Sequence, residues 1–259
     1  MPKLLNVDSS PKTVKGVRHG FSTAILYLAP WTASGKSVCP VAALAGCGES
    51  CLNVSGRGAI APGGAVISTP AGELPDNAIQ RARLTRTALY HSSRDEFMAQ
   101  LVAEVEAFVR RAERLQLTPA IRLNGTSDIA YERRHPVTRN GIDYPSIMAA
   151  FPTVQCYDYT KRAHRFAHEL PPNYHLTLSY SEANPAYAAR CIAAHERGAA
   201  LAVVVRDATR KSEALAGIAR GPIVDGDAHD LRFLDGAGTC VALKAKGKAK
   251  RDTSGFVVG

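Results

Sequence analysis

Residues 154–206 read VQCYDYTKRAHRFAHELPPNYHLTLSYSEANPAYAARCIAAHERGAALAVVVR, and in them apolar strand-like runs alternate with helix-like stretches. The strand-like runs are VQCYDY, YHLTLSY and ALAVVVR, which are mostly continuous in apolar character, with little alternation between the two faces. Continuous apolar strands separated by helices are typical of a parallel sheet that is covered by helices. This stretch therefore predicts an α/β fold.

The same alternation extends outward in both directions. Before the stretch come the strand-like FSTAILYLAP (21–30), a helix over 76–90, a second helix that opens at the capping box of 93–96 and ends near Leu115, strand-like PAIRLNG (119–125) and helical YPSIMAAF (144–151). After it come the short helical SEALAGIA and the strand-like PIVDGD, LRFL and TCVALKA. We predict a complete or partial (β/α) TIM-like barrel of parallel strands, with an open doubly wound sheet as the alternative.

Length and composition indicate one main domain. We expect a flexible basic arm over 1–20, a single α/β domain over 21–243, and a basic C-terminal segment over 244–259. No run approaches the roughly 18–20 apolar residues needed to cross a bilayer, so we expect no membrane. The N-terminal residues lack the apolar core of a secretory signal, which predicts a cytoplasmic protein, in the host cytoplasm if the chain is phage-encoded.

The charge balance favours polyanionic partners. The net charge is +9 and the pI is near 9.4, and the segment 244–251, KAKGKAKR, holds five basic residues in eight. Such a segment predicts nucleic-acid contact through phosphates, with a solvated chain end as the alternative.

Three cysteines lie close together in the sequence, in a glycine-rich stretch after the first strand. Their spacing is Cys39-x7-Cys47-x3-Cys51, inside a loop over 31–72 that is long for a compact domain. Three thiolates without an obvious fourth ligand fit a 4Fe-4S cluster with one open iron. A zinc site that takes its fourth ligand from a histidine, or inert thiols, are the alternatives. Arg57, in the turn SGRG, is a candidate anion ligand.

Polar side chains follow each predicted strand at its carboxyl end, the edge on which barrel active sites are built. We expect Asp158, Lys161 and Glu182 to bind substrate or transfer protons. Candidate residues for a small-molecule cofactor are Asn124, Gly125, Ser127, Asp128 and Arg57. Because the cysteine loop also follows a strand, the sequence predicts one shared site at this edge.

Several motifs together resemble the phage and plasmid family called gene product 88. They are CLNVSGRG, QRARLTRTALY with RDEFMAQL, IRLNGTSDIAYE, YDYTK, and the closing DGDAHDLRFLD and VALKAKGKAKRDTSGFV, which cover nearly the whole chain from about Phe21. The resemblance implies relatives and not a reaction. A more distant resemblance is to radical S-adenosylmethionine enzymes, in which a partial barrel carries a three-cysteine loop after its first strand. Their cysteines are separated by three and two residues, whereas here the separations are seven and three.

From these features we expect an iron–sulfur enzyme that acts on a nucleic acid or a nucleotide, with S-adenosylmethionine as a candidate second cofactor. Cys39, Cys47 and Cys51 would hold the cluster. The alternative is a non-catalytic nucleic-acid-binding protein whose zinc or iron–sulfur site is structural.

Overall fold

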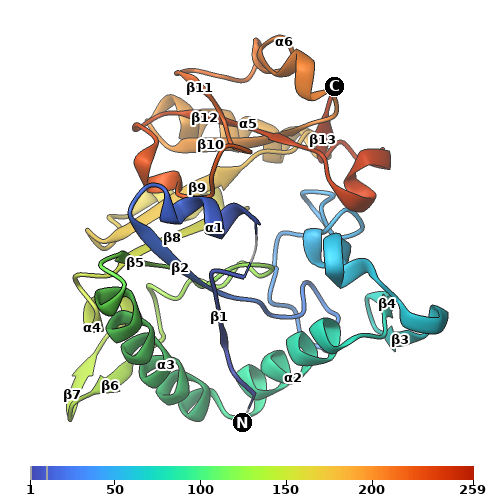
Figure 1. Ribbon diagram of the computed structural model, residues 1–259. Coiled ribbons are helices and arrows are strands. Elements are labelled where there is room, and N and C mark those ends of the chain that lie inside the picture. The colour runs from blue at the N-terminus through green and yellow to red at the C-terminus, as the bar shows by residue number, and fades with distance from the viewer. Residues whose placement is uncertain (1, 10) are drawn as a thin grey trace.

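The structure, a computed structural model, describes residues 2–9 and 11–259. Within that part of the chain, nine strands form the main sheet (Figure 1). They are β1 (Leu5–Val7), β2 (Phe21–Leu26), β5 (Thr118–Arg122), β8 (Gln155–Thr160), β9 (Tyr174–Ser179), β10 (Ala200–Val205), β11 (Ile223–Asp225), β12 (Cys240–Lys244) and β13 (Val257–Val258).

The sheet is mostly parallel and open. Its strand order is β1-β2-β5-β8-β9-β10-β12-β11, and β13 pairs with β10 beside this path. Among the described strands of this sheet, β1 pairs with β2 in antiparallel orientation and all other pairs are parallel. The predicted α/β class with a parallel sheet is therefore confirmed, and the described strands do not close into a complete barrel.

Most of the helices cover one face of this sheet. They are α1 (Pro11–Val17), α2 (Ala78–Ser92), α3 (Arg94–Arg114), α4 (Ile147–Ala150), α5 (Pro185–Glu196) and α6 (Lys211–Leu215). The two predicted long helices match α2 and α3 to within about two residues. Ser93 is the N-cap of α3 as expected, but its side chain makes no cap hydrogen bond. By contrast, the predicted helix RAHRFAHEL forms only a 3₁₀ turn, η4 (Ala163–Ala167).

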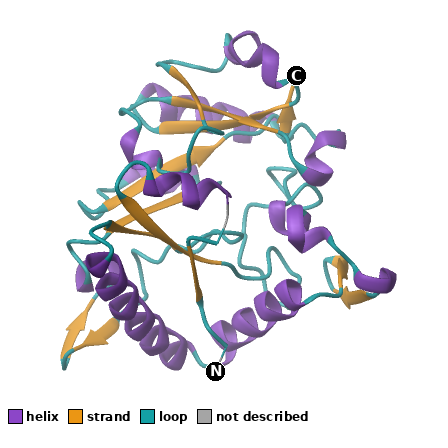
Figure 2. Ribbon diagram, viewed as in Figure 1, coloured by secondary structure: helices purple, strands orange, loops and turns teal. Residues whose placement is uncertain are grey.

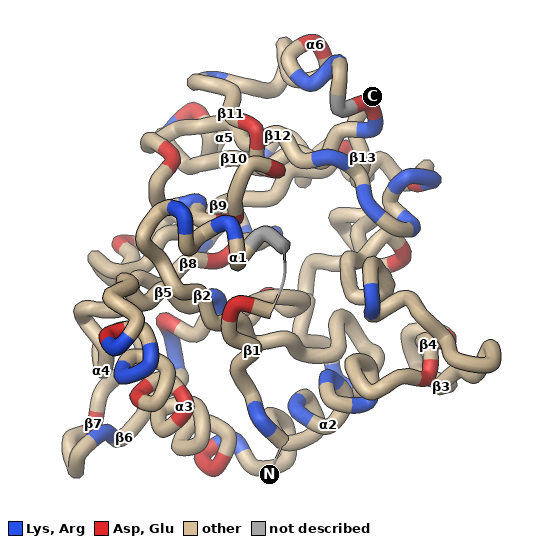
Figure 3. Tube along the Cα trace, viewed as in Figure 1, with Lys and Arg blue, Asp and Glu red and all other residues tan. Residues whose placement is uncertain are grey.

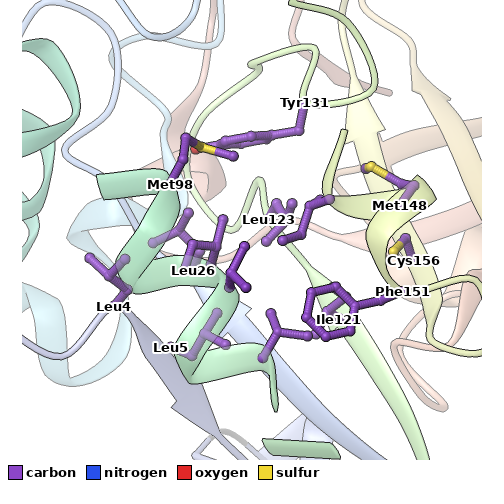
Figure 4. Close-up of a cluster of buried hydrophobic side chains, with 14 of the residues drawn as sticks. Leu4, Leu5, Leu26, Met98, Ile121, Leu123, Tyr131, Met148, Phe151 and Cys156 are labelled. Atoms are coloured by element: carbon purple, nitrogen blue, oxygen red, sulfur yellow. The ribbon is translucent and has the colours of Figure 1, made fainter. Parts of the chain in front are cut away.

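Two hydrophobic clusters lie against the helix-covered face. The first joins β1, β2, β5 and β8 to α3 and α4, and Figure 4 shows its side chains, among them Leu26, Ile121 and Met148. The second joins β9, β10 and β12 to α5 and α6. Figure 2 shows the same division, with α2 and α3 at one end of the sheet and α5 and α6 at the other. The side chains buried on this face come from alternate positions of each parallel strand. The remaining positions therefore point to the opposite face of the sheet.

Two hairpins lie outside the main sheet, and the sequence analysis missed both. They are β3 (Val66–Thr69) with β4 (Gly72–Pro75), and β6 (Val137–Arg139) with β7 (Ile142–Tyr144). The turn between β6 and β7 is Asn140–Gly141, and both residues have positive φ. An Asn-Gly pair is the strongest local signal for a tight hairpin, so this hairpin was predictable from the sequence.

The two chain ends are built into the fold, which differs from the expected arm over 1–20 and the separate segment over 244–259. Leu4 and Leu5 are fully buried and β1 pairs with β2; residues 1 and 10 lie outside the described part. At the other end, β13 pairs with β10. Apolar side chains hold both ends in place. In the sequence these side chains stand among basic residues, so each end has the composition of a solvated segment.

None of the helices in the described part of the chain has the length and apolar character that a membrane span requires.

Candidate functional site

The cysteine loop follows β2 directly, so it starts at the carboxyl edge of the sheet. The loop consists of turns up to Cys51, after which the 3₁₀ turns η1 (Leu52–Val54) and η2 (Gly56–Ala59) follow. Cys39, Cys47 and Cys51 are free thiols and are half-buried. The carboxyl ends of β5, β8 and β9 reach the same edge because these strands run parallel to β2.

Backbone groups of the loop bind the three sulfur atoms. The Trp31 N–H donates to Cys39 Sγ at 3.3 Å, and the Asn53 N–H donates to Cys51 Sγ at 3.5 Å. Cys47 instead donates to the Ala42 carbonyl at 3.8 Å. Hydrogen bonds from amides to sulfur are among the contacts that tune iron–sulfur centres in proteins.

The three thiols lie near enough to influence one another electrostatically. Burial raises the pKa of Cys39, and the neighbouring Cys51, Asp128 and Cys47 raise it further, against a hydrogen bond from Trp31 that lowers it. Burial likewise raises the pKa of Cys51 to about 11, with a further upward contribution from Cys47. Burial therefore favours the protonated thiols, and a metal would have to displace those protons on binding.

Two glycines allow the loop to pack tightly around the cysteines. Gly46 has a φ of +63°, and a Cβ there would lie 2.6 Å from Ser254 Oγ and 2.7 Å from Ala183 Cβ. A Cβ on Gly48 would lie 2.7 Å from the Trp31 ring. These glycines are present because side chains at both positions would collide with neighbours from distant parts of the chain.

No group of three or more histidine, cysteine, aspartate or glutamate side chains is arranged to hold a metal ion among the described residues. The assignment of Cys39, Cys47 and Cys51 as metal ligands therefore stays a prediction.

The predicted cofactor turn after β5 lies against the cysteine loop. The Asp128 N–H donates to the Val38 carbonyl at 2.8 Å, and Cys39 Sγ donates to the Thr126 carbonyl at 3.7 Å. Gly125 is needed because a Cβ there would lie 2.6 Å from the Tyr27 ring. The turn after β5 thus contacts the cysteine loop at Val38 and Cys39, and its role as part of a shared site stays a prediction.

The polar side chains of this turn are engaged by the protein itself. The Asp128 carboxylate accepts hydrogen bonds from Thr160 Oγ1 at 2.7 Å and from the Lys161 N–H at 2.8 Å. Asn124 donates from its N–H and from Nδ2 to Asp158, at 2.7 and 3.0 Å, and its own Oδ1 accepts from Ser127 Oγ at 2.9 Å. These contacts tie the ends of β5 and β8 together.

A buried arginine, which the sequence analysis missed, completes this network. Arg165 is 1% exposed and pairs with Glu132 at 2.7 Å and with Asp128 at 3.3 Å. It also donates to the Tyr174 hydroxyl at 2.8 Å, which in turn donates to Asp158 at 3.0 Å. Arg165 looked like one residue of a solvated helix in the sequence, and no local signal marks it as buried.

Lys161 is the predicted catalytic residue that lies nearest the thiols. Its Nζ donates to the Tyr180 carbonyl at 3.2 Å and lies 4.3 Å from the centre of the Phe256 ring. Burial lowers the pKa of Lys161, against upward contributions from Cys47, Cys191 and Asp128. Its ammonium group therefore lies beside the part of the cysteine loop that contains Cys47.

The two other predicted residues are exposed. Glu182 follows β9, where its N–H donates to the Gly255 carbonyl at 2.8 Å. Arg57 lies on η2, beyond the three cysteines. Both lie on segments that border the loop, and neither contacts the thiols among the described residues.

The C-terminal segment forms an outer wall of the cysteine loop, which the sequence analysis did not predict. The Asp252 carboxylate accepts hydrogen bonds from the Ser50 hydroxyl and from the Val257 N–H, and Ser254 Oγ donates to the Gly46 carbonyl at 3.0 Å. Burial alone would raise the pKa of Asp252, but hydrogen bonds from Ser50, Ser254 and Val257 outweigh it and lower the pKa. This carboxylate therefore fastens the segment to the loop as an anion.

The basic residues of this segment lie beside the same loop. The turn η7 (Gly247–Arg251) packs against η1, directly after Cys51. Figure 3 shows lysine and arginine gathered along this part of the chain. Exposed members of the group are Lys244, Lys246, Lys248, Lys250 and Arg251.

A hollow of about 370 Å³ lies elsewhere, at the amino edge of the sheet, where Tyr174, His175 and Asp235 are among its lining residues. It contains none of the three loop cysteines. We place the candidate site at the carboxyl edge because the thiols, the Asp128 network and Lys161 converge there.

Comparison with known proteins identifies one family. The family model described as gene product 88 matches residues 4–259. No curated protein and no solved structure matches the chain.

Proposed function

The chain belongs to the gene product 88 family, and we propose that it is an iron–sulfur enzyme, similar to radical S-adenosylmethionine enzymes, that acts on a nucleotide or a nucleic acid. The observation that carries the proposal is the presence of three free thiols on one loop that starts at the carboxyl edge of a parallel sheet. Thiolates at that position are suited to a soft metal centre next to a substrate pocket.

The order of the strands supports a partial barrel over a doubly wound sheet. β2, β5, β8, β9 and β10 are neighbours in the order in which they occur in the chain. A doubly wound sheet reverses its direction at a switch point, whereas a barrel adds each strand on the same side of the previous one. The order of these five strands therefore favours an open, partial (β/α) barrel, although β12 and β11 depart from it at the end of the sheet.

The donor set, three free cysteines on one loop, has the number and type of ligands that a cubane cluster with one open iron takes, although the three sulfurs are not arranged around a metal ion in the described part of the chain. The thiols are unpaired by disulfides, and amide groups already donate to two of the sulfurs. When bound, the cluster would supply one-electron chemistry. The chain itself would hold the three thiolates, keep the Lys161 ammonium beside Cys47, and set the turn after β5 at a fixed place above the sheet.

Asp128 and Asn124 act as positioning residues in this proposal. Their side-chain groups are occupied by protein partners, so a bound small molecule would meet mainly the backbone of the turn Asn124–Asp128. Glu182 is exposed at the same edge and stays a candidate for proton transfer.

Cysteine variants test the proposal directly. We expect anaerobically purified protein to be brown, to absorb at about 400 nm and to contain about four irons per chain. Cys39→Ser, Cys47→Ser and Cys51→Ser should each lose most of the iron and the colour. Cys240→Ala is the matched control, because Cys240 is buried on β12 away from the loop, and it should keep both.

Two results would contradict the proposal. One is colourless protein that carries stoichiometric zinc, and the other is iron content that survives substitution of any one loop cysteine. A rise in melting temperature on zinc loading would instead support a structural metal site.

A second function is favoured by the position of η7. Because this basic turn packs on η1 beside the cysteine loop, a closed metal site there would fix a phosphate-binding surface. The protein would then be a non-catalytic nucleic-acid-binding protein. Its exposed lysines would contact the backbone of the nucleic acid and not its bases.

A charge-removing variant tests this second function. Lys248, Lys250 and Arg251 are exposed, so their joint replacement by Gln leaves the fold intact. If they contact phosphates, affinity for duplex or single-stranded DNA should fall, and the slope of log K against log salt should decrease by about 2–3. Joint replacement of the exposed Arg110 and Arg114 of α3 is the control. Equal salt slopes in wild type and variant would contradict nucleic-acid binding at η7.

A further inference from the structure

The face of the sheet that lies opposite the hydrophobic clusters is polar near its carboxyl edge. Arg122 on β5 is in register with Ile25 of β2, and Tyr27 follows on the same face of β2. Tyr157 and Tyr159 of β8 alternate with the core-facing Cys156 and therefore point to this face as well. An arginine and three tyrosines thus share a surface that begins next to the cysteine loop.

Two guanidinium groups lie on tyrosine rings of this surface. Arg122 lies over the Tyr159 ring, with 4.7 Å between its Cζ and the ring centre, and Arg83 of α2 lies over the Tyr27 ring at 5.0 Å. Each guanidinium is fixed through one nitrogen. Arg122 Nη1 donates to Asp230 at 3.1 Å, and Arg83 Nη1 donates to Asn53 Oδ1 at 2.6 Å.

Each of these arginines also has a donor without an acceptor. The Nε atoms of Arg83 and of Arg122 are buried and have no hydrogen-bond partner in the part of the chain that the structure describes. The Arg122 side chain is 14% exposed. Buried polar groups are nearly always satisfied in folded proteins, so each of these two donors calls for an acceptor from outside the described chain, a water or an oxygen of a ligand.

Both guanidinium groups act on one hydroxyl. Burial raises the pKa of Tyr27, while Arg122 and Arg83 each lower it, which requires both positive charges to lie near the Tyr27 ring. Asp230 is the one carboxylate that contributes to the same pKa. Two cations against one anion leave this place with a positive charge.

The place also adjoins the cysteine loop. Asn53, which holds Arg83, follows Cys51 by two positions and donates its N–H to the Cys51 sulfur. Gly125, in the turn after β5, lies against the Tyr27 ring on the side of the loop. A ligand held between Arg83 and Arg122 would therefore lie on the side of the loop that carries Cys51.

We propose that Arg83, Arg122 and Tyr27 form a binding site for the phosphate group of a nucleotide. Planar guanidinium groups with free N–H edges suit phosphate oxygens, and the partly exposed rings of Tyr27 and Tyr159 offer surfaces for stacking the base; Tyr157 is fully buried and does not take part. The inference rests on the proposed function, because it names the substrate class of the same site. The expected ligand of this site is a mononucleotide.

Calorimetric titration of the full chain tests the proposal. The probes are the four deoxynucleoside monophosphates, the corresponding nucleosides and inorganic phosphate. At least one monophosphate should bind more tightly than its nucleoside and more tightly than phosphate. Arg83→Gln should weaken that binding at least ten-fold, and Arg122→Lys, which keeps a charge beside Asp230 and so protects folding, should weaken it several-fold.

Arg94→Gln is the matched control. Arg94 also lies over a tyrosine ring, that of Tyr90, at 3.7 Å, but it does so at the start of α3 within the first hydrophobic cluster. Its substitution should leave nucleotide affinity unchanged. The proposal is overturned if no monophosphate binds, if Arg83→Gln binds as tightly as wild type, or if only oligonucleotides bind.

Iron content separates this proposal from the proposed function. Brown wild-type protein that binds no mononucleotide would overturn the phosphate site and leave the cluster standing. Colourless protein in which nucleotide binding depends on Arg83 would support the phosphate site and reject the iron–sulfur enzyme.

Discussion

At the scale of single residues, the carboxylate of Asp158 has an unusual environment. It is 1% exposed, and it accepts hydrogen bonds from Asn124 and from Tyr174. Burial raises its pKa to about 6, although the hydrogen bonds of Asn124 and the charges of Arg122 and Arg165 oppose the rise. Folding therefore favours the protonated form of the Asp158 carboxyl group.

The pH dependence of stability should report this shift. Because the pKa of Asp158 is higher in the folded than in the unfolded protein, its contribution to stability is greatest below about pH 4 and falls as the pH rises towards 6. The loss should be about 3 kcal/mol or less. The measurement is urea unfolding of wild type and of Asp158→Asn at several pH values from 4 to 7. The difference in free energy of unfolding between the two proteins should change with pH by this amount. A difference that stays constant with pH would reject the raised pKa.

At the scale of the element, the cysteine loop depends on close packing as much as on its thiols. Gly46→Ala adds a methyl group that collides with Ser254 and Ala183, at a residue whose φ is +63°. If the loop holds the proposed iron–sulfur cluster, the variant should lose most of the iron although it keeps all three cysteines. Stability should fall by about 1–3 kcal/mol, from backbone strain and overpacking together.

A second glycine of the same loop separates these two causes. Gly35 has a φ of +87°, but a Cβ there would meet nothing within 4 Å. Gly35→Ala thus imposes the backbone strain without the collision, and it should keep its metal. Metal analysis and thermal melting of both variants are the measurements. Equal metal loss in both would show that packing against the C-terminal segment does not matter.

At the scale of the whole molecule, the parts of the fold that the sequence predicted are those governed by local pattern. The apolar runs at β8, β9 and β10 predicted parallel strands, since such strands must be buried on both faces. The stripe of Phe97, Leu101 and Val105 predicted α3, and all three residues are fully buried.

What the sequence did not predict depends on which strands become neighbours. Arg165 joins Glu132, Asp128 and Tyr174, and no local spacing relates these positions. The candidate site divides in the same way. The cysteines were visible as a motif, whereas the arginines that lie over Tyr27 and Tyr159 came together only through strand register and the placement of α2.

The hydrogen bond from Ser50 to Asp252 has a consequence for the order of events during synthesis, because the two residues are 202 positions apart. A ribosome that adds about 5–20 residues per second needs at least about ten seconds to make the intervening chain. During that interval the C-terminal segment that packs on the cysteine loop has not yet been made, so oxidants can reach the three thiols. The cysteine loop therefore reaches its final packing only after residues 252–257 have been made.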